Sequence, residues 1–170
     1  MKELDSLYLI GFMGSGKSTI GKVLSKRLNV PLYDMDNEIV LKAEKEIKDI
    51  FAEEGESVFR DYETTILKQM PTKDAIISTG GGVIEREDNR EWLKNKQSIY
   101  LRVSFDTVKK RLKKDASRPL WNDSSKDKKE LLNQRDPKYT LSATYTIDVD
   151  SLSVEEVVDE IVKTLNLHEL

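Results

Sequence analysis

The fold class of this chain is decided by one stretch near its N-terminus, Gly11-Phe12-Met13-Gly14-Ser15-Gly16-Lys17-Ser18. The stretch matches the pattern G-x-x-x-x-G-K-[ST] at every fixed position, and it lies between an apolar run at 7–10 and an amphipathic segment at 17–28. Glycines allow successive backbone N–H groups to point inward, and the N-terminus of a following helix adds positive potential. The sequence therefore predicts a strand, a phosphate-binding loop and a helix, in that order.

The predicted loop also assigns chemistry to its side chains. Lys17 is expected to reach the β- and γ-phosphates of a nucleotide, and the Ser18 hydroxyl to bind Mg²⁺. The other predicted nucleotide-binding residues of this segment are Gly14, Ser15, Gly16 and Thr19. A glycine-rich turn that matches the pattern by chance is the alternative, and the strand and helix around the loop argue against it.

The nucleotide is expected to be ATP, bound with Mg²⁺. GTP is the other nucleotide that such a loop commonly binds. The stretch Asn95-Lys96-Gln97-Ser98 is close to the guanine-binding pattern Asn-Lys-x-Asp, but it lacks the aspartate. A turn between a helix and the next strand explains this stretch more simply, so we predict ATP.

Outside the loop, short apolar runs alternate with amphipathic segments along the chain. The predicted strands are 7–10, 30–33, 75–77, 98–103 and 145–149. The predicted helices are 17–28, a broken 37–54, 56–70, 87–95, 105–114, 126–135 and a last helix capped by Ser153 and Glu156. Nearly continuous apolar strands are typical of parallel sheets covered on both faces. We therefore predict a three-layer α/β/α fold with a five-stranded parallel sheet.

Two segments do not fit a simple alternation of strands and helices. Residues 37–70 hold more helix than one crossover needs, which predicts a helical insert at about 37–62. Residues 113–128 are polar, charged and rich in turn-forming residues, which predicts a lid-like surface loop at about 113–126. A chain of 170 residues without internal repeats fits one domain, 1–170.

The composition excludes several classes of protein. Hydrophobic residues make up 38% and charged residues 35%, which is typical of a globular chain. Cysteine is absent and His168 is the one histidine, so neither a disulfide framework nor a Ser-His-Asp triad is expected. No apolar stretch approaches the roughly 18 residues of a membrane span. With 28 basic and 31 acidic residues the net charge is −3, which disfavours nucleic acid as a partner. We expect a cytoplasmic monomer.

Polar residues and glycines follow the second and third predicted strands, where ligands bind in open parallel sheets. Asp34 and Asp36 come directly after the second strand. Of two carboxylates there, one can bind Mg²⁺ and the other can bind an acceptor hydroxyl. A pair that caps the following helix is the alternative. Three consecutive glycines, Gly80, Gly81 and Gly82, follow the third strand and are expected where backbone approaches a ligand closely, unless they form a plain loop.

Three arginines are candidates for anion binding. Arg60 precedes Glu63 by three residues in a predicted helix, so the carboxylate can orient the guanidinium, unless the two form an exposed surface pair. Arg118 falls in the predicted lid, where an arginine can stabilise charge on a transferring phosphoryl group. Arg135 is expected to end a helix before Pro137. Most arginines are ordinary surface charges, so these gain their significance from the motifs around them.

The order of these motifs resembles the shikimate kinase family. The matching motifs are the phosphate-binding loop, Asp-x-Asp, Phe-Arg-x-x-Glu, Gly-Gly-Gly, Arg-Pro-Leu and Arg-x-Pro-x-Tyr, from about residue 8 to residue 158. The resemblance implies a P-loop kinase fold of the nucleoside-monophosphate-kinase (adenylate-kinase-like) type, with a helical substrate-binding insert and a lid. It also implies transfer of the ATP γ-phosphoryl group to the 3-hydroxyl of shikimate, which gives shikimate 3-phosphate and ADP on the route to chorismate and the aromatic amino acids.

The resemblance implies roles on the acceptor side of the site. Asp36 matches the residue that holds shikimate hydroxyls and accepts a proton. Arg60 and Arg135 match the pair that binds the substrate carboxylate. The substrate pocket is implied to be lined by the glycines Gly80, Gly81 and Gly82.

The resemblance implies roles on the nucleotide side as well. Asp34 matches the aspartate that acts with Ser18 at Mg²⁺. Arg118 matches the lid arginine that reaches the nucleotide phosphates, and Arg111 falls where the family packs an arginine against adenine. The usual partner of that arginine is often a proline, and the residue here is Val154.

Two other functions stay open on the residues alone. One is a different small-molecule kinase of the same fold, for example of the gluconate type. The other is a nucleotide-binding module without catalysis, which the intact Lys17, Asp36 and Arg118 argue against. The basic run at 109–114 raises nucleic acid as a ligand, but an acidic chain favours a solvated helix face there.

Overall fold

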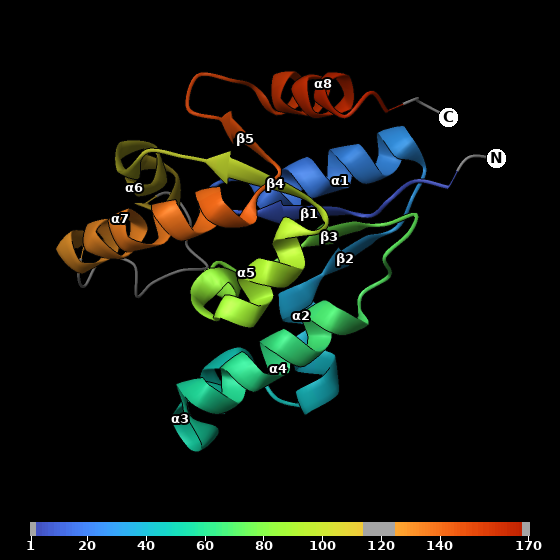
Figure 1. The fold of residues 1–170 in the computed structure, drawn as a ribbon. Coiled ribbons are helices and arrows are strands. Elements are labelled where there is room, and N and C mark those ends of the chain that lie inside the picture. The colour runs from blue at the N-terminus through green and yellow to red at the C-terminus, as the bar shows by residue number, and fades with distance from the viewer. Residues whose placement is uncertain (1–2, 114–124, 168–170) are drawn as a thin grey trace.

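A five-stranded parallel sheet lies at the centre of the fold (Figure 1). The computed structural model describes residues 3–113 and 125–167, without the side chains of 125 and 126. The strands run in the order β2-β3-β1-β4-β5, and every neighbouring pair is parallel. Their bounds are Leu7–Ile10 for β1, Leu32–Asp34 for β2, Ile76–Ser78 for β3, Gln97–Arg102 for β4 and Tyr145–Asp148 for β5. The predicted α/β fold is confirmed.

Helices cover both faces of the sheet and complete the three layers (Figure 1). α1 (Lys17–Leu28) and α8 (Val154–Thr164) pack against each other on one face. α5 (Glu87–Lys94) and α7 (Ser125–Ser142) pack against each other and against β4 on the opposite face. α6 (Phe105–Lys113) follows β4 and also contacts α7. In the described part of the chain, no helix is long and apolar enough to cross a bilayer.

The ends of these helices are set by local sequence. Ser153 Oγ accepts a hydrogen bond from the Glu156 N–H at 3.2 Å, so the predicted cap of the last helix is confirmed. α1 ends at Asn29, whose φ of 52° lies in the left-handed region that asparagine tolerates. Lys26 and Arg27 lie in the last turn of α1, where positive charge complements the helix dipole.

The hydrophobic core is centred on the inner strands. All four residues of β1 and all three of β3 are buried, as the continuous apolar runs predict. β5 differs because it lies at the edge of the sheet. Ile147 is its one buried residue, whereas Tyr145 is 39% exposed. Both faces of the sheet are therefore covered at the inner strands, but not at the edge formed by β5.

Three helices between β2 and β3 extend away from the sheet (Figure 1). They are α2 (Met35–Ala43), α3 (Ile47–Glu54) and α4 (Glu56–Gln69). The predicted break after the first of them is present, with Glu44 at a left-handed φ of 54°. α3 and α4 join at Gly55, whose φ is 89°. These helices occupy the segment of the predicted insert, and its role in substrate binding stays a prediction.

α7 continues beyond the point where the sequence predicted its end. The expectation that the helix ends at Arg135, before Pro137, is wrong, because the helix runs through the proline to Ser142. A proline inside a helix removes one backbone hydrogen bond. The turns on either side are held by packing, since Leu132, Arg135 and Tyr139 are all buried on one face. The η1 turn (Val83–Glu85) lies against this helix.

The predicted lid at about 113–126 lies largely outside the described residues. The chain is described up to residue 113 at the end of α6, and again from residue 125 at the start of α7. Arg118, the arginine predicted in this segment, is therefore outside the described part of the chain, and its role stays a prediction.

Candidate active site

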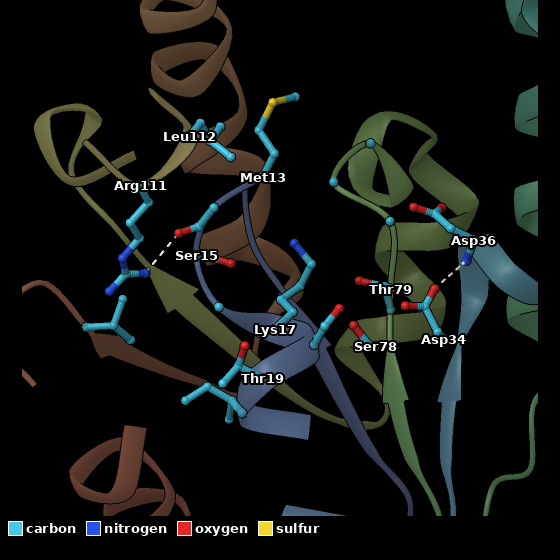
Figure 2. Close-up of a pocket in the computed structure, with 18 of the residues that line it drawn as sticks. Met13, Ser15, Lys17, Thr19, Asp34, Asp36, Ser78, Thr79, Arg111 and Leu112 are labelled. Carbon is cyan, nitrogen blue, oxygen red and sulfur yellow. Dashed lines mark hydrogen bonds between the residues drawn. The ribbon is translucent and has the colours of Figure 1, made fainter. Parts of the chain in front are cut away.

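The loop between β1 and α1 has the backbone that its sequence predicts. Gly14 and Gly16 adopt left-handed φ angles of 81° and 95°, which glycine reaches without steric penalty. Gly16 is also the N-cap of α1, so the first N–H groups of that helix face the loop. Lys17 Nζ donates to the carbonyls of Gly11 at 2.5 Å and Phe12 at 3.2 Å. In Figure 2 its side chain points into the space in front of the loop.

One cavity of about 650 Å³ extends from this loop across the carboxyl ends of the strands. All predicted site residues in the described ranges line it: Gly14, Ser15, Gly16, Lys17, Ser18, Thr19, Asp34, Asp36, Arg60, Gly80, Gly81, Gly82, Arg111 and Arg135. Segments that are far apart in the sequence therefore meet at one place, as expected where parallel strands end together.

The nucleotide end of the cavity has an apolar wall. Arg111 on α6 donates to the carbonyl of Gly14 at 2.9 Å (Figure 2), which places its guanidinium over the phosphate-binding loop. Leu112, Leu152 and Val157 line the cavity beside it, together with Val154. Sequence reasoning did not assign the first three of these to the site. Apolar residues in helices carry no local signal that separates a binding wall from the core.

Asp34 and Asp36 stand at the junction of β2 and α2. The helix begins at Met35, two residues earlier than predicted, so Asp34 is its N-cap. Asp34 Oδ1 accepts from the N–H groups of Asp36 at 3.0 Å and Asn37 at 3.3 Å, as Figure 2 shows for the first of these bonds. The capping alternative is correct for Asp34. Among the described residues its second oxygen, Oδ2, has no hydrogen-bond partner, which leaves that atom for a cation.

Arg60 and Glu63 form a buried ion pair on α4. Arg60 Nη1 donates to Glu63 Oε1 at 2.9 Å, and Glu63 is only 1% exposed. The alternative of an exposed surface pair is therefore wrong. Burial raises the pKa of Glu63 above its ordinary value, against the opposing effect of Arg60, and the negative charge of Asp36 raises it further. The positive charge of Arg135 also acts to lower the pKa of this carboxyl, so charged residues on α2, α4 and α7 influence one another here.

Each of the three glycines after β3 makes room for a different charged side chain. A Cβ on Gly80 would lie 2.9 Å from Glu63 Oε2, and one on Gly82 only 2.2 Å from Arg60 Nη1. A Cβ on Gly81 would lie 3.6 Å from Arg135 Nη1, which is an ordinary contact. Glycine is thus required by close packing at 80 and 82, and less so at 81.

Arg135 is a buried cation with unused hydrogen-bonding capacity. The residue is 8% exposed, and its Nε has no hydrogen-bond partner among the described residues. Glu85 Oε1 lies 3.8 Å from that nitrogen. A buried, partly unsatisfied guanidinium in a cavity is suited to binding an anion such as a carboxylate.

The residues near the loop also fit a bound Mg²⁺. Mg²⁺ prefers oxygen ligands, keeps several waters and takes one or two protein ligands beside substrate phosphates. The Ser18 hydroxyl and Asp34 Oδ2 supply such oxygens at the edge of the cavity. Within residues 3–113 and 125–167 no group of three or more acidic, histidine or cysteine side chains gathers around a cation position. This donor set therefore suits a cation that arrives with a nucleotide.

Fold and loop together define the class of protein. A phosphate-binding loop after the central strand of a 2-3-1-4-5 parallel sheet, facing carboxylates and arginines across one cavity, is the arrangement of a P-loop phosphotransferase. The family model described as shikimate kinase matches residues 13–166. The chain belongs to the shikimate kinase family, whose members are ATP-dependent phosphotransferases.

Individual relatives support this membership over nearly the full chain. A shikimate kinase of Bacillus cereus is 43% identical over 164 residues, which is 96% of this chain and 99% of the relative. A shikimate kinase of Enterococcus faecalis is 39% identical and covers 95% of this chain and 99% of the relative. The structure of shikimate kinase from Acinetobacter baumannii in complex with shikimate superposes with a TM-score of 0.88 at 35% identity, covering 96% and 93% of the two chains.

Proposed function

We infer that the cavity transfers the γ-phosphoryl group of Mg·ATP to the 3-hydroxyl of shikimate, which gives shikimate 3-phosphate and ADP. The observation that carries this assignment is the pair of arginines beside the glycine turn, a half-buried Arg60 and a buried Arg135, which line the same cavity as Asp36 and the phosphate-binding loop. They match a small acceptor that carries one carboxylate and several hydroxyls. The relative from Acinetobacter baumannii, whose structure contains shikimate, supports the same substrate.

On the nucleotide side, the backbone of the loop binds the phosphates. The N–H groups from Gly14 to Thr19 surround the β-phosphate, and Lys17 exchanges the carbonyls of Gly11 and Phe12 for phosphate oxygens. Arg111 lies at the adenine end, and Arg118 of the lid is assigned to the phosphates. Mg²⁺, held through Ser18 and Asp34, neutralises charge on the phosphate oxygens when it is bound.

On the acceptor side, charged side chains orient the substrate. Arg60 and Arg135 bind the carboxylate with two planar guanidinium groups, a geometry that lysine does not offer. Glu63 fixes Arg60 from behind at 2.9 Å. Asp36 accepts hydrogen bonds from the substrate hydroxyls and takes the proton of the attacking hydroxyl. Gly80, Gly81 and Gly82 allow the substrate ring to lie directly against the backbone.

Catalysis then follows mainly from position and charge. Phosphoryl transfer needs the attacking oxygen in line with the leaving oxygen, and it needs positive charge around the phosphoryl oxygens. Lys17 and Arg118 supply that charge, whereas Asp36 places the hydroxyl. The protein is further proposed to be cytoplasmic. We also propose that it works as a monomer, since the described site residues of one chain share one cavity.

The experiment is an assay of ADP release from Mg·ATP with shikimate as acceptor. Gluconate and a nucleoside monophosphate serve as competing acceptors, and the primary amide of shikimate keeps every hydroxyl while removing the carboxylate charge. We expect turnover with shikimate, little turnover with the competing acceptors, and a large rise in KM for the amide. Turnover with gluconate or a nucleotide in place of shikimate would contradict the assignment. Nucleotide binding without turnover on any acceptor would point to a non-catalytic module.

A further inference from the structure

Tyr139 lies behind the acceptor side of the cavity, bonded to the lining residue Gly81, but it has no part in the reaction described above. Its side chain is fully buried on α7, and its hydroxyl donates to the carbonyl of Gly81 at 2.5 Å. Tyr139 follows Arg135 by four residues, so both side chains lie on the same face of the helix. The sequence shows this spacing in the motif Arg-x-Pro-x-Tyr, but gives the tyrosine no role.

The Tyr139 hydroxyl also lies near the charge of Arg135. Burial raises the pKa of Tyr139, and the positive charge of Arg135 opposes that rise. The phenol therefore stays protonated at neutral pH, where it donates to the Gly81 carbonyl. Arg135 lies beside the same glycine, since a Cβ on Gly81 would be 3.6 Å from Arg135 Nη1.

Arg135 has a competing partner on its other side. Glu85 Oε1 lies 3.8 Å from Arg135 Nε and 3.3 Å from Lys138 Nζ, at the end of η1. This carboxylate competes with a bound acceptor for the guanidinium when the glycine turn is not held in place. An arginine held by Glu85 presents fewer N–H groups to an acceptor in the cavity.

The ring of Tyr139 is anchored separately from its hydroxyl. It packs against Tyr100 of β4 with ring centroids 4.8 Å apart. The Tyr100 hydroxyl donates to Asp136 Oδ1 at 2.6 Å, so it ties the same turn of α7 to the centre of the sheet. The two buried tyrosines thus differ in one respect: the hydroxyl of Tyr139 contacts the site, and that of Tyr100 does not.

We propose that Tyr139 is a positioning residue for acceptor binding, whose hydroxyl fixes the Gly81 carbonyl and with it the turn against which the Arg135 guanidinium lies. The inference rests on the proposed function, because it assumes that Arg135 binds the carboxylate of the acceptor. A purely structural tyrosine would fill the core with its ring, and its hydroxyl would serve only to satisfy a buried carbonyl. The two roles make different predictions for a phenylalanine at this position.

The test compares Tyr139→Phe with the matched variant Tyr100→Phe. Each removes one hydrogen-bonded hydroxyl from the same stacked pair and leaves the ring in place. For Y139F we expect the KM for shikimate to rise about tenfold, as for the loss of one hydrogen bond, with kcat and the KM for ATP within about twofold of wild type. For Y100F we expect all three constants within about twofold of wild type. Thermal unfolding of both variants shows that each is folded.

A further pair of variants tests whether Tyr139 acts through Arg135. In an Arg135→Ala background, Y139F is expected to add no further increase in the KM for shikimate, because the guanidinium that it positions is gone. Additive effects, or a Y139F protein that behaves like Y100F, would overturn the positioning role while leaving the proposed function intact. A wild-type protein that does not phosphorylate shikimate would overturn both.

Discussion

The two halves of the cavity are built in different ways. The phosphate-binding part of the nucleotide half is one continuous stretch, residues 11–19, whose backbone N–H groups and one lysine face the phosphates. The acceptor half takes its residues from α2, α4, the turn after β3 and α7. Backbone donors are fixed by the loop itself, whereas charged side chains on three of these elements, α2, α4 and α7, must be fixed by one another. The phosphate-binding part of the nucleotide half can therefore be predicted from the sequence, whereas the arrangement of the acceptor half depends on packing.

The acceptor half is also tightly coupled. Glu63 holds Arg60 at 2.9 Å, and the positions of Gly80 and Gly82 leave room for these two side chains and no more. Arg135 of α7 lies beside Gly81, the middle glycine of the same turn. A substitution in the loop of the nucleotide half should change one function, whereas one in the acceptor half should also displace its neighbours. Four measurements test this difference.

The largest effect is expected in the nucleotide half, from Lys17→Ala. Loss of a cation that stabilises phosphoryl charge should lower kcat on the order of 10²–10³-fold, with little change in unfolding temperature. Steady-state kinetics and thermal unfolding measure the two quantities. Lys22→Ala, which removes an exposed lysine of the same helix, is the control and should match wild type. A loss of stability in K17A comparable to that of a core variant would show that the loop is not independent.

The second largest effect is expected in the acceptor half, from Arg60→Ala. The KM for shikimate should rise about 10- to 100-fold, since a charge-assisted hydrogen bond is lost, while the KM for ATP changes little. The free energy of unfolding should fall as well, because the buried Glu63 loses its partner. The control is Arg102→Ala, whose arginine pairs with Asp148 near the surface. Equal changes in both KM values would contradict the separation of the two halves.

A smaller effect is expected from adding one methyl group to the glycine turn. Gly82→Ala places a Cβ 2.2 Å from Arg60 Nη1, so the guanidinium must move, and the KM for shikimate should rise about tenfold. Gly81→Ala is the matched control, because its Cβ would lie 3.6 Å from its nearest neighbour and should change the KM by less than about threefold. Similar values for the two variants would mean that the turn tolerates both, and that its packing does not set the position of Arg60.

The smallest effect is a change of stability with pH, tested by Glu63→Gln. The pKa of Glu63 is raised in the folded state, so folded protein holds this proton more tightly than unfolded protein does. The contribution of the carboxyl is therefore full below its unfolded value of 4.5 and is lost as pH rises through the higher folded pKa. The unfolding free energy of wild type minus that of E63Q should decrease with rising pH in this window. Urea unfolding at several pH values measures it.

The control for that series is Glu56→Gln, a change of an exposed carboxylate that also pairs with Arg60, at 3.4 Å. The same urea series on E56Q measures how much of the E63Q effect comes from removing any carboxylate beside Arg60. A difference for E63Q that stays flat or grows with pH would show that the pair with Arg60 outweighs burial at this site.

The sequence predicted the residues of the site better than their surroundings. The predicted site residues in the described ranges line one cavity. The phosphate-binding loop, the two aspartates and the glycine turn each follow a strand, and parallel strands end together. The burial of Glu63 could not be read from its spacing to Arg60, since exposed pairs share that spacing. The path of α7 through Pro137 was likewise missed, because helix propensity at a proline is outweighed here by the packing of Tyr139 and Leu132.

Local chemistry thus determines some features of this protein, and long-range packing determines the others. By itself the sequence determined the phosphate-binding loop, the parallel α/β sheet and the membership in a family of kinases, because glycine conformations and apolar periodicity act within a few residues. Only the tertiary structure decided that Asp34 caps a helix, that Glu63 is buried behind Arg60, and that the Tyr139 hydroxyl donates to the carbonyl of Gly81. Each of these outcomes depends on burial and on distances that no local pattern encodes.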